Sequence, residues 1–279
     1  MTVTAGRLVL VATPIGNLGD LSARAVEALR SADEIWCEDT RRTRALLTHA
    51  AIPGAGRLRA VHAHNEAAAA ARLVEAVRDG RTIAYASDAG MPGISDPGTR
   101  LVAACAAAGL HVELVPGPSA ALSALVLSGL PTERCTFEGF LPRKGPARRR
   151  RLANIATSTA TTVVFEAPAR VAATIADLAG VCGDDRPAAV ARELTKRYEE
   201  ILRGPLGELR TIDPRGECVI VVGPSPCANG ADDATIDEAI RDELDAGKSA
   251  RDAAAAVAEV LGIAKRRAYE RALAVRRAG

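Results

Sequence analysis

The sequence predicts an α/β protein with two sheet domains followed by a small all-helical domain. Its 279 residues are enough for two domains with separate hydrophobic cores. Short apolar runs of strand length alternate with runs whose apolar residues recur every three or four positions, which favours mainly parallel sheets covered by helices. From residue 235 onwards only the helical pattern continues. We therefore expect domains at 5–115, 118–226 and 235–279.

The first domain is expected to hold a parallel sheet. Its strands are predicted at Leu8–Ala12, Glu34–Cys37, Leu58–His62, Thr82–Ala86 and Val112–Val115. Ser22, Thr40 and Thr99 have side chains that accept hydrogen bonds from the free amides of a helix start, so each predicts a helix. A further helix at Glu66–Arg78 ends before Gly80. Because a helix separates each strand from the next, the strands should run in one direction.

A mixed sheet is expected beyond the hinge-like segment Pro116–Ser119. The apolar helix Ala120–Leu127 begins this second domain. Strands are predicted at Thr162–Glu166, Ala188–Glu193 and Cys218–Gly223, a helix at Val171–Ala179 and a hairpin at Glu199–Arg203. The segment Pro224–Asp233 has linker composition. The tail should form helices at Ile236–Leu244, Ala250–Leu261 and Lys265–Val275, the last two joined at Gly262 as in a helix-turn-helix.

Composition and motifs exclude several classes of protein. Aromatic residues make up 3% of the chain, too few for an aromatic platform that stacks single-stranded nucleic acid. No apolar run is long enough to span a bilayer, and six cysteines without a C-x-x-C pair indicate a reduced, cytoplasmic protein. No G-x-G-x-x-G follows the first strand, so a Rossmann dinucleotide site is not supported. His62 and His64 have no third ligand nearby, and no metal site is expected.

The segment Ser87–Gly98 is the strongest candidate for a ligand loop. It follows an apolar strand and contains three glycines and two prolines in twelve residues. Such a backbone is rigid and can approach a ligand closely. Ligands of open α/β sheets gather at the carboxyl ends of the strands, where this loop begins. Asp88 is placed there to accept from a ribose hydroxyl or to pair with a cation.

Seven short motifs occur in one order along the chain. They are Thr13–Asp20, Glu38–Arg41, His64–Glu66, Ser87–Gly98, Pro116–Pro118, Glu138–Pro142 and Ala191–Lys196. Together they resemble the ribosomal RNA small subunit methyltransferase I family, ribose 2′-O-methyltransferases of the tetrapyrrole-methylase-like superfamily. The resemblance covers about residues 5–226. It implies the class III methyltransferase fold, with two α/β domains, S-adenosylmethionine in a cleft between them, and usually a homodimer. The implied substrate is a cytidine ribose in the decoding region of 16S ribosomal RNA.

The resemblance also implies a set of cofactor contacts. They are Pro14, Ala86, Ser87, Asp88, Met91, Ser119, Ala120, Glu166 and Leu194. These positions lie at or beside predicted strand ends or helix starts, where backbone donors are free. Ser119 is also a plausible helix cap that could bond the carboxylate end of the cofactor. For Ala86, Ala120 and Leu194, packing is an equally simple explanation.

Methyl transfer to a ribose hydroxyl requires alignment of the two reactants and removal of a proton. Candidate bases are Glu38, Asp39, Glu66 and Glu193, and candidate cations are Lys196 and Arg41. Of these we select Asp39 as the catalytic residue nearest the chemistry, with Arg41 beside it as an RNA contact.

Two basic clusters predict contacts with RNA phosphates. One comprises Arg143, Lys144, Arg148, Arg149, Arg150 and Arg151, and the other Lys265, Arg266, Arg267, Arg271, Arg276 and Arg277, opposed only by Glu270. The net charge of the chain is only +2, so these clusters are local features.

Two other functions stay open. A small-molecule methyltransferase, for example of a tetrapyrrole, would need neither cluster, and a non-enzymatic nucleic-acid-binding regulator would leave Ser87–Gly98 without a role.

Overall fold

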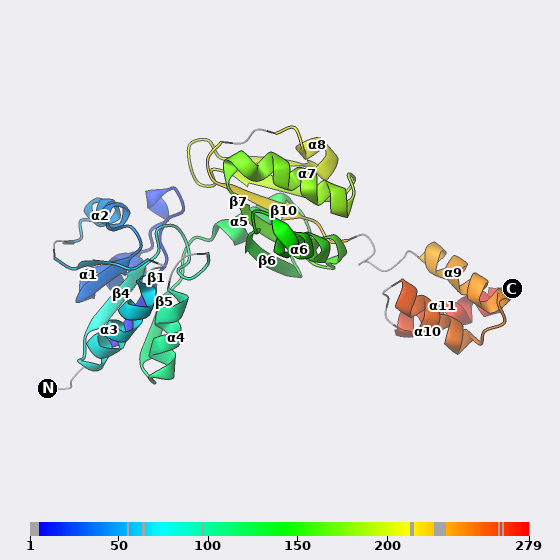
Figure 1. Ribbon diagram of the computed structural model, residues 1–279, viewed down its shortest axis with the longest axis horizontal. Coiled ribbons are helices and arrows are strands. Elements are labelled where there is room, and N and C mark those ends of the chain that lie inside the picture. The colour runs from blue at the N-terminus through cyan, green and yellow to red at the C-terminus, as the bar shows by residue number, and fades with distance from the viewer. Residues whose placement is uncertain are drawn as a thin grey trace. The chain divides into compact units, whose positions relative to one another are not determined.

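The computed structural model describes residues 6–54, 56–62, 65–95, 98–212, 215–225, 233–261, 263 and 265–278. His64, Gly262 and the loop residues Asp96 and Pro97 lie outside the described residues. The chain forms two compact units, Met1–Ser123 with Glu193–Glu200, and Ala124–Arg192 with Ile201–Gly279. Each unit contains a five-stranded sheet (Figure 1). The expected fold class, two α/β sheets with a helical C-terminal region, is confirmed, while the domain limits 5–115, 118–226 and 235–279 stay a prediction.

The first sheet has the strand order β3-β2-β4-β1-β5, and its adjacent strands are parallel, as expected. Its strands are β1 (Arg7–Val11), β2 (Glu34–Cys37), β3 (Leu58–Ala60), β4 (Thr82–Ala86) and β5 (His111–Val115). The helices are α1 (Ala23–Ser31), α2 (Thr40–His49), α3 (Glu66–Arg78) and α4 (Thr99–Ala107), with a 3-10 turn η1 (Leu18–Asp20). Strand β3 is shorter than predicted because the His62 N–H donates to Asn65 Oδ1 in the turn into α3.

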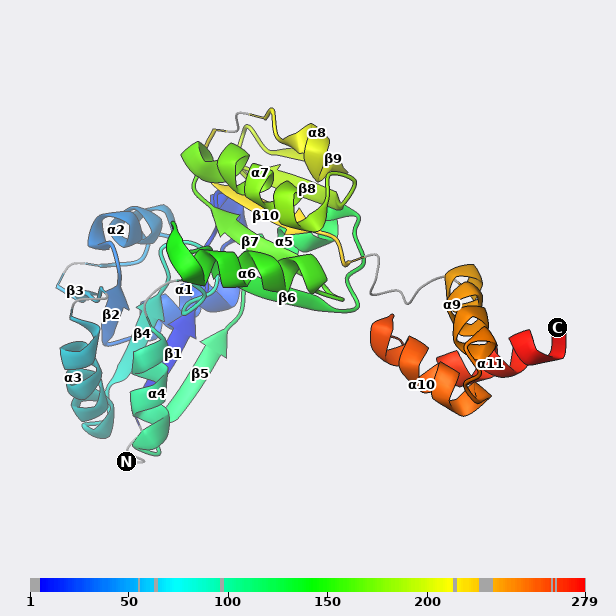
Figure 2. The same cartoon turned by 45° about the vertical axis from the view of Figure 1, so that its right-hand side comes forward.

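Two hydrophobic cores cover the two faces of this sheet. Leu29 of α1 and Leu47 of α2 pack with Val9, Ile35 and Ala84 on one face. On the other face, α3 and α4 pack side by side over a second cluster of buried residues (Figures 1 and 2). Strand β1 therefore continues into a helix on one face, and its neighbour β4 continues into a helix on the opposite face. Adjacent strands of this kind open a crevice at their carboxyl ends, the usual ligand site of such sheets.

Side-chain oxygens accept hydrogen bonds from the free amides at the starts of three of these helices. Ser22 caps α1 as predicted, since its hydroxyl accepts from the Ala25 N–H. The prediction of Thr40 as a cap is wrong, because Asp39 accepts from the Arg41 N–H and Thr40 is the first helical residue. Helix α4 starts at Thr99 with Gly98, at φ 123°, as its N-cap, so the prediction that Thr99 caps this helix is wrong. The free amides there donate to the buried Glu66, at 2.8 Å from Gly98 and 3.2 Å from Arg100.

The second sheet is mixed, as predicted, with the order β6-β7-β10-β8-β9. Its strands are β6 (Cys135–Phe140), β7 (Thr161–Glu166), β8 (Pro187–Arg192), β9 (Glu200–Pro205) and β10 (Cys218–Val222). Strand β6 is parallel to β7, and β10 is antiparallel to β7 and β8. The predicted hairpin at Glu199–Arg203 is instead the single strand β9, and β6 was not predicted.

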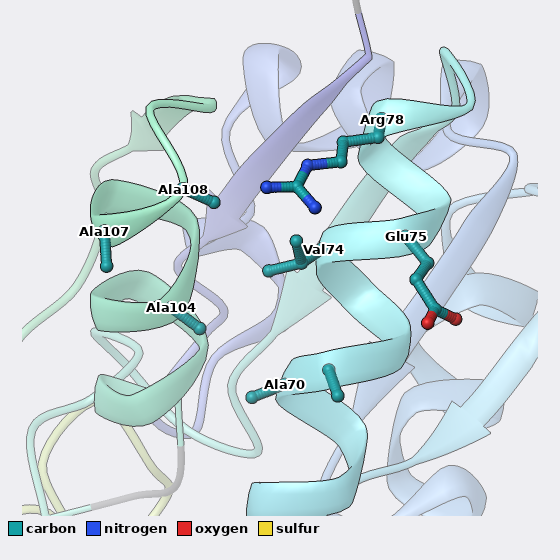
Figure 3. A pocket seen from close by; sticks show the side chains of 8 residues that line it. Ala70, Val74, Glu75, Arg78, Ala104, Ala107 and Ala108 are labelled. Carbon is teal, nitrogen blue, oxygen red and sulfur yellow. The ribbon is translucent and has the colours of Figure 1, made fainter.

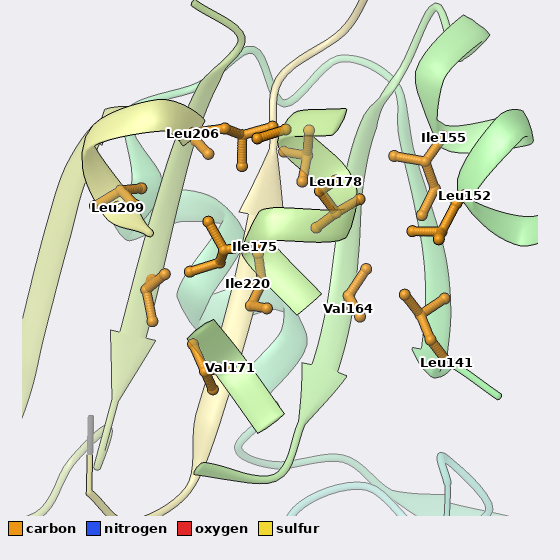
Figure 4. Packing of buried hydrophobic residues seen from close by; sticks show 14 of the residues in the cluster. Leu141, Leu152, Ile155, Val164, Val171, Ile175, Leu178, Leu206, Leu209 and Ile220 are labelled. Carbon is orange, nitrogen blue, oxygen red and sulfur yellow. The ribbon is translucent and has the colours of Figure 1, made fainter. Parts of the chain in front are cut away.

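The helices of this unit are α5 (Ala120–Ser128), α6 (Gly145–Thr157), α7 (Val171–Cys182) and the short α8 (Leu206–Leu209), with a 3-10 turn η2 (Pro168–Arg170). Figure 4 shows the core formed by α6, α7, α8 and the sheet, in which Ile175, Leu178 and Ile220 are completely buried. This core fixes the carboxyl end of β7 and the start of α7 relative to α6.

The C-terminal helices have a core of their own. Helices α9 (Asp233–Asp245), α10 (Ala250–Val260) and α11 (Lys265–Ala278) pack on one another (Figure 2). Ile236, Ile240, Val257 and Ala272 are buried among them. The predicted helices are confirmed. In the described part of the chain, no helix combines the length and apolarity that a membrane span requires.

Candidate functional site

The loops that follow β1 and β4 are fastened together at the carboxyl edge of the first sheet. Thr13 and Gly90 exchange a pair of backbone hydrogen bonds, both 3.0 Å long. The Thr13 hydroxyl donates to the carbonyl oxygen of Ser87 at 2.9 Å, in a buried position. Because β1 and β4 lead to opposite faces of the sheet, this contact joins the two loops at the edge where ligands of such sheets usually bind.

A third loop, after β5, meets the other two at Gly90. This glycine has φ +81°, and a Cβ there would lie 3.1 Å from Ile15 and 3.2 Å from the carbonyl oxygen of Pro118. The chain then enters α5, where Ser119 Oγ accepts from the Leu122 N–H at 3.4 Å. The predicted capping by Ser119 is thus present, and the first turn of a nine-residue helix begins at this edge.

Asp88 connects β4 to β2. Its Oδ1 accepts from the Asp39 N–H at 3.0 Å. Asp39 in turn accepts from the Arg41 backbone at 2.8 Å and pairs with the Arg41 guanidinium at 3.0 Å. The hydrogen bonds from the Arg41 side chain and backbone lower the pKa of the Asp39 carboxyl to about 2. A carboxylate with such a pKa is a poor proton acceptor at neutral pH, so this environment argues against Asp39 as the general base.

The segment Glu193–Glu200 belongs to the first unit although it lies between two strands of the second sheet. The Asn17 N–H donates to Thr195 Oγ1 at 3.1 Å. A Cβ at Gly16 would meet Lys196 Cγ at 2.4 Å, so only glycine allows this approach. Glu193 and Thr195 have positive φ values of 49° and 65°. Strained backbone of this kind concentrates at functional sites. Here it occurs in the segment that contacts Gly16 and Asn17.

The other predicted site residues of the first unit lie around this edge. Pro14, Ala86 and Ser87 are buried, Met91 is half-buried in the loop after β4, and Ala120 opens α5. Leu194 is buried, and its carbonyl oxygen faces Gly16. Ala86 packs in the core below the sheet edge, so only its backbone is available to a ligand. Sequence reasoning did not single out Thr13, Asn17 or Thr195, although all three lie within the quoted motifs.

Glu166 lies in the second unit, at the end of β7. Its side chain is fully buried, and it accepts from the Ala167 N–H at 2.9 Å and from the Thr174 hydroxyl at 2.7 Å. It also pairs with Arg170 at 3.3 Å. Glu166 therefore has protein partners for both carboxylate oxygens, whatever it contributes to a cofactor.

The four consecutive arginines of α6 lie on different faces of the helix, so they differ in exposure. Arg148 is only 8% exposed and binds Asp177, Thr174 and the Pro142 carbonyl oxygen. Arg151 is half-buried and pairs with Glu138. Arg149 and Arg150 are exposed, as are Arg143 and Lys144 just before the helix. The prediction that Arg148 and Arg151 present free charge to RNA is therefore not supported, because both guanidinium groups are directed at acidic partners.

The basic cluster of the tail is opposed by more acidic residues than expected. Arg267 pairs with Asp233 at 3.0 Å, and Arg271 donates to Asp237 at 2.7 Å. The expectation that only Glu270 opposes this cluster is wrong, because α9 packs its acidic side against α11. Lys265 and Arg266 are exposed at the start of α11.

A groove of about 440 Å³ lies elsewhere, between α3 and α4. Alanines line most of it, and Figure 3 shows Arg78 extending across it while Glu75 points away. It follows the carboxyl-terminal halves of both helices, which lie toward the amino ends of the strands. The groove therefore lies at the opposite edge of the sheet from Gly90. Its α4 wall consists of alanines and offers no nucleophile or base, so the groove is not part of the candidate site.

Comparison with known proteins defines the class. Residues 7–210 match the family model of the tetrapyrrole (corrin/porphyrin) methylases. A solved structure of uroporphyrin-III C-methyltransferase from Thermus thermophilus, in complex with S-adenyl homocysteine, superposes with a TM-score of 0.56 at 21% identity, covering 78% of this chain and 97% of that chain. Diphthine synthase superposes with a TM-score of 0.58 at 18% identity, covering 77% and 90%. At these identities, the solved structures establish the shared fold.

Closer relatives identify the family within this class. A protein of Mycobacterium bovis named ribosomal RNA small subunit methyltransferase I is 43% identical over 280 residues, covering 99% of this chain and 97% of its own. A protein of the same name from Xylella fastidiosa is 51% identical over 225 residues, covering 78% and 82%. The chain belongs to the ribosomal RNA small subunit methyltransferase I family of methyltransferases, and the resemblance expected from its motifs is confirmed.

Proposed function

We propose that this protein transfers a methyl group from S-adenosylmethionine to the 2′-hydroxyl of a cytidine in 16S ribosomal RNA of the small subunit. The observation that carries the proposal is the 43% identity to a ribosomal RNA methyltransferase over 99% of this chain, the basic tail included. The tetrapyrrole methylase named above is 21% identical and shares the fold. A tetrapyrrole substrate is therefore the less favoured alternative. A non-enzymatic regulator would not require the loops after β1, β4 and β5 that meet at Gly90.

The carboxyl edge of the first sheet has the chemical groups that fit this cofactor. A Cβ at Gly90 would crowd Ile15 and the Pro118 carbonyl oxygen, so glycine lets the three loops meet closely at the edge where the cofactor would bind. The free amides at the start of α5 suit a carboxylate. In the proposal, Pro14, Ser87, Met91 and Leu194 contact the cofactor together with the backbone at Ala86, and Asp88 accepts from its ribose. Ser119 and Ala120 hold its carboxylate end.

When bound, the cofactor supplies a methyl group carried on a sulfonium. Positive charge is neutralised as that group moves, so the task of the protein is alignment of the ribose oxygen rather than stabilisation of an oxyanion. The hydroxyl must also release its proton. Asp39, charged down to about pH 2, serves in this proposal to orient Arg41 toward the RNA. Glu193 is then the candidate for that base, and it pairs at 2.8 Å with Lys196, whose side chain packs against Gly16.

Four exposed basic residues supply the RNA contacts on the second unit, namely Arg143, Lys144, Arg149 and Arg150. On the tail, Lys265 and Arg266 are exposed in the same way, with Arg267 beside them. Lys and Arg contacts to phosphates supply affinity that falls with salt. The expected partner is the small ribosomal subunit or its RNA in the cytoplasm.

We further infer that the protein acts as a homodimer. Val126 of α5 is 70% exposed, and Phe140 of β6 is 55% exposed while its ring packs edge-on against Phe165. Leu122, one turn before Val126 on α5, is 59% exposed as well, and apolar side chains grouped on one exposed face are typical of interfaces. Light scattering should give twice the mass of the chain, and Val126→Asp should reduce it to the monomer mass. A monomeric wild-type protein would contradict this inference.

Methyl transfer from labelled S-adenosylmethionine tests the function directly. The purified protein is incubated with small subunits, with naked small-subunit RNA and with a porphyrinoid in parallel. We expect label in RNA only, recovered as 2′-O-methylcytidine after digestion. Label in the porphyrinoid alone would replace the proposal with the tetrapyrrole alternative, and binding of the cofactor without transfer to either would refute both substrates.

A further inference from the structure

Two neighbouring carbonyl groups in the turn after β6 are each held by an arginine. Arg170 donates to the Leu141 carbonyl oxygen at 3.4 Å, and Arg148 donates to the Pro142 carbonyl oxygen at 3.1 Å. Arg143 and Lys144 follow directly, both exposed, before α6 begins at Gly145. The two arginines come from different elements, so together they fix the backbone of this turn against α6 and η2.

The two arginines are linked to each other through buried groups. Arg148 donates to the Thr174 hydroxyl at 3.0 Å, and that hydroxyl donates its only proton to Glu166 at 2.7 Å. Glu166, with a fully buried side chain, pairs with Arg170 at 3.3 Å. The connections form a closed ring from Leu141 through Arg170, Glu166, Thr174 and Arg148 to Pro142. Asp177 balances the charge of Arg148 at 2.7 Å, so both guanidinium groups have a carboxylate partner, as buried charges require.

We propose that this ring positions the turn Leu141–Lys144 for RNA, with Glu166 and Thr174 as positioning residues. The inference rests on the proposed function. A turn fixed before binding loses less conformational entropy when Arg143 and Lys144 contact phosphates, so the affinity for RNA rises. The ring also gives Glu166 a role distinct from the cofactor contact that the family resemblance implies, and it explains why Arg148 is buried between the exposed Lys144 and Arg149.

Thr174→Val is the most selective test, because valine has nearly the shape of threonine and lacks the hydroxyl that joins the two halves of the ring. We expect the KM for small-subunit RNA to rise about five-fold, the effect of about one hydrogen bond. The kcat and the Kd for S-adenosylmethionine should not change. Thr174→Ser keeps the hydroxyl and should restore the wild-type KM. Thr157→Val is the matched control, since that exposed hydroxyl bonds only to carbonyls of its own helix among the described contacts.

Glu166→Gln separates the two roles of Glu166. A raised KM for RNA with unchanged cofactor affinity supports the ring. A loss of cofactor affinity with an unchanged KM for RNA would instead make Glu166 a cofactor contact and overturn the proposal. An unchanged KM for RNA in folded Thr174→Val would overturn it as well. If Thr174→Val does not fold, Arg170→Lys gives the same test with the same expected rise, because lysine keeps the positive charge beside Glu166 and lacks the guanidinium that reaches the Leu141 carbonyl oxygen.

Amide hydrogen exchange distinguishes failure of this inference from failure of the proposed function. In Thr174→Val the amides of Leu141, Arg143, Lys144 and Gly145 should exchange faster than in the wild type, whatever the substrate of the enzyme. Faster exchange combined with a wild-type enzyme that methylates no RNA would refute the function and leave the ring in place. Unchanged exchange would refute the ring itself.

Discussion

Gly90→Ala tests whether the loops after β1, β4 and β5, which meet at Gly90, form the cofactor site. At φ +81° an alanine is disfavoured by about 1–2 kcal/mol, partly offset by about 0.4–1 kcal/mol from the stiffer unfolded chain. The new Cβ would also lie 3.1 Å from Ile15 and 3.2 Å from the Pro118 oxygen. Crowding of this kind adds about 1 kcal/mol or more unless the loops move apart. The free energy of unfolding should therefore fall by about 1–3 kcal/mol.

Gly109→Ala is the matched control. Gly109 has φ +67°, but no atom lies within 4 Å of the position that its Cβ would occupy. It should lose only the conformational part, about 1 kcal/mol. Calorimetric titration of both folded variants with S-adenosylmethionine then separates stability from binding. We expect affinity to fall at least about ten-fold in Gly90→Ala, a change of about 1.4 kcal/mol, and to stay unchanged in Gly109→Ala. Wild-type affinity in Gly90→Ala would refute this placement of the site.

Three further predictions concern charge and the tail. Asp88→Asn keeps an oxygen acceptor for the Asp39 N–H, so thermal unfolding should show a preserved fold. Calorimetry should show weaker cofactor binding, because the carboxylate is lost. Unchanged affinity would contradict the proposal that Asp88 binds the cofactor. Replacing Arg149 and Arg150 with serine should lower the salt slope of RNA binding by about two, and an unchanged slope would make them a solvated helix face only. The fragment 1–230 should keep its melting temperature and cofactor affinity and lose RNA affinity through a raised KM; a much lower melting temperature would show that the tail supports the rest of the chain.

The pH dependence of stability provides a fifth prediction. The pKa of Asp39 is lowered from 3.8 to about 2 in the folded protein. Its stabilising contribution is therefore complete above about pH 4 and is lost as the pH falls through about 2. Asp39→Asn should flatten the acid side of the stability curve in thermal melts and leave the shape of the pH–rate profile near neutrality unchanged. A rate profile that loses its acidic limb in this variant would identify Asp39 as the base after all.

Local patterns were sufficient to predict the elements around the site. Buried strands such as Thr82–Ala86 stand out because both faces of a parallel sheet are covered and the run is continuously apolar. Strand β6 was missed because its six residues are exposed or half-buried, without the alternation that marks a strand. The cap of α2 was misplaced by one residue because Asp39 and Thr40 both have suitable side chains.

Tertiary contacts account for the other differences. Arg148 looked like one of four equivalent arginines, yet it lies four residues before Leu152 and seven before Ile155, on the buried face of α6. That spacing was visible in the sequence, whereas its partners Thr174 and Asp177 were not. The docking of Glu193–Glu200 against Gly16 and Asn17 has no local signature. It depends on residues nearly 180 positions apart, and a single sequence does not pair them.

The central claim, ribose methylation of small-subunit RNA, is tested most directly in cells. Ribose methylation is mapped along 16S RNA from the native organism, from a strain that lacks this protein, and from the same strain complemented with the wild type or with Gly90→Ala. The account predicts that one 2′-O-methylcytidine disappears on deletion, returns with the wild-type gene and is reduced with Gly90→Ala. An identical methylation map in the deletion strain would contradict it.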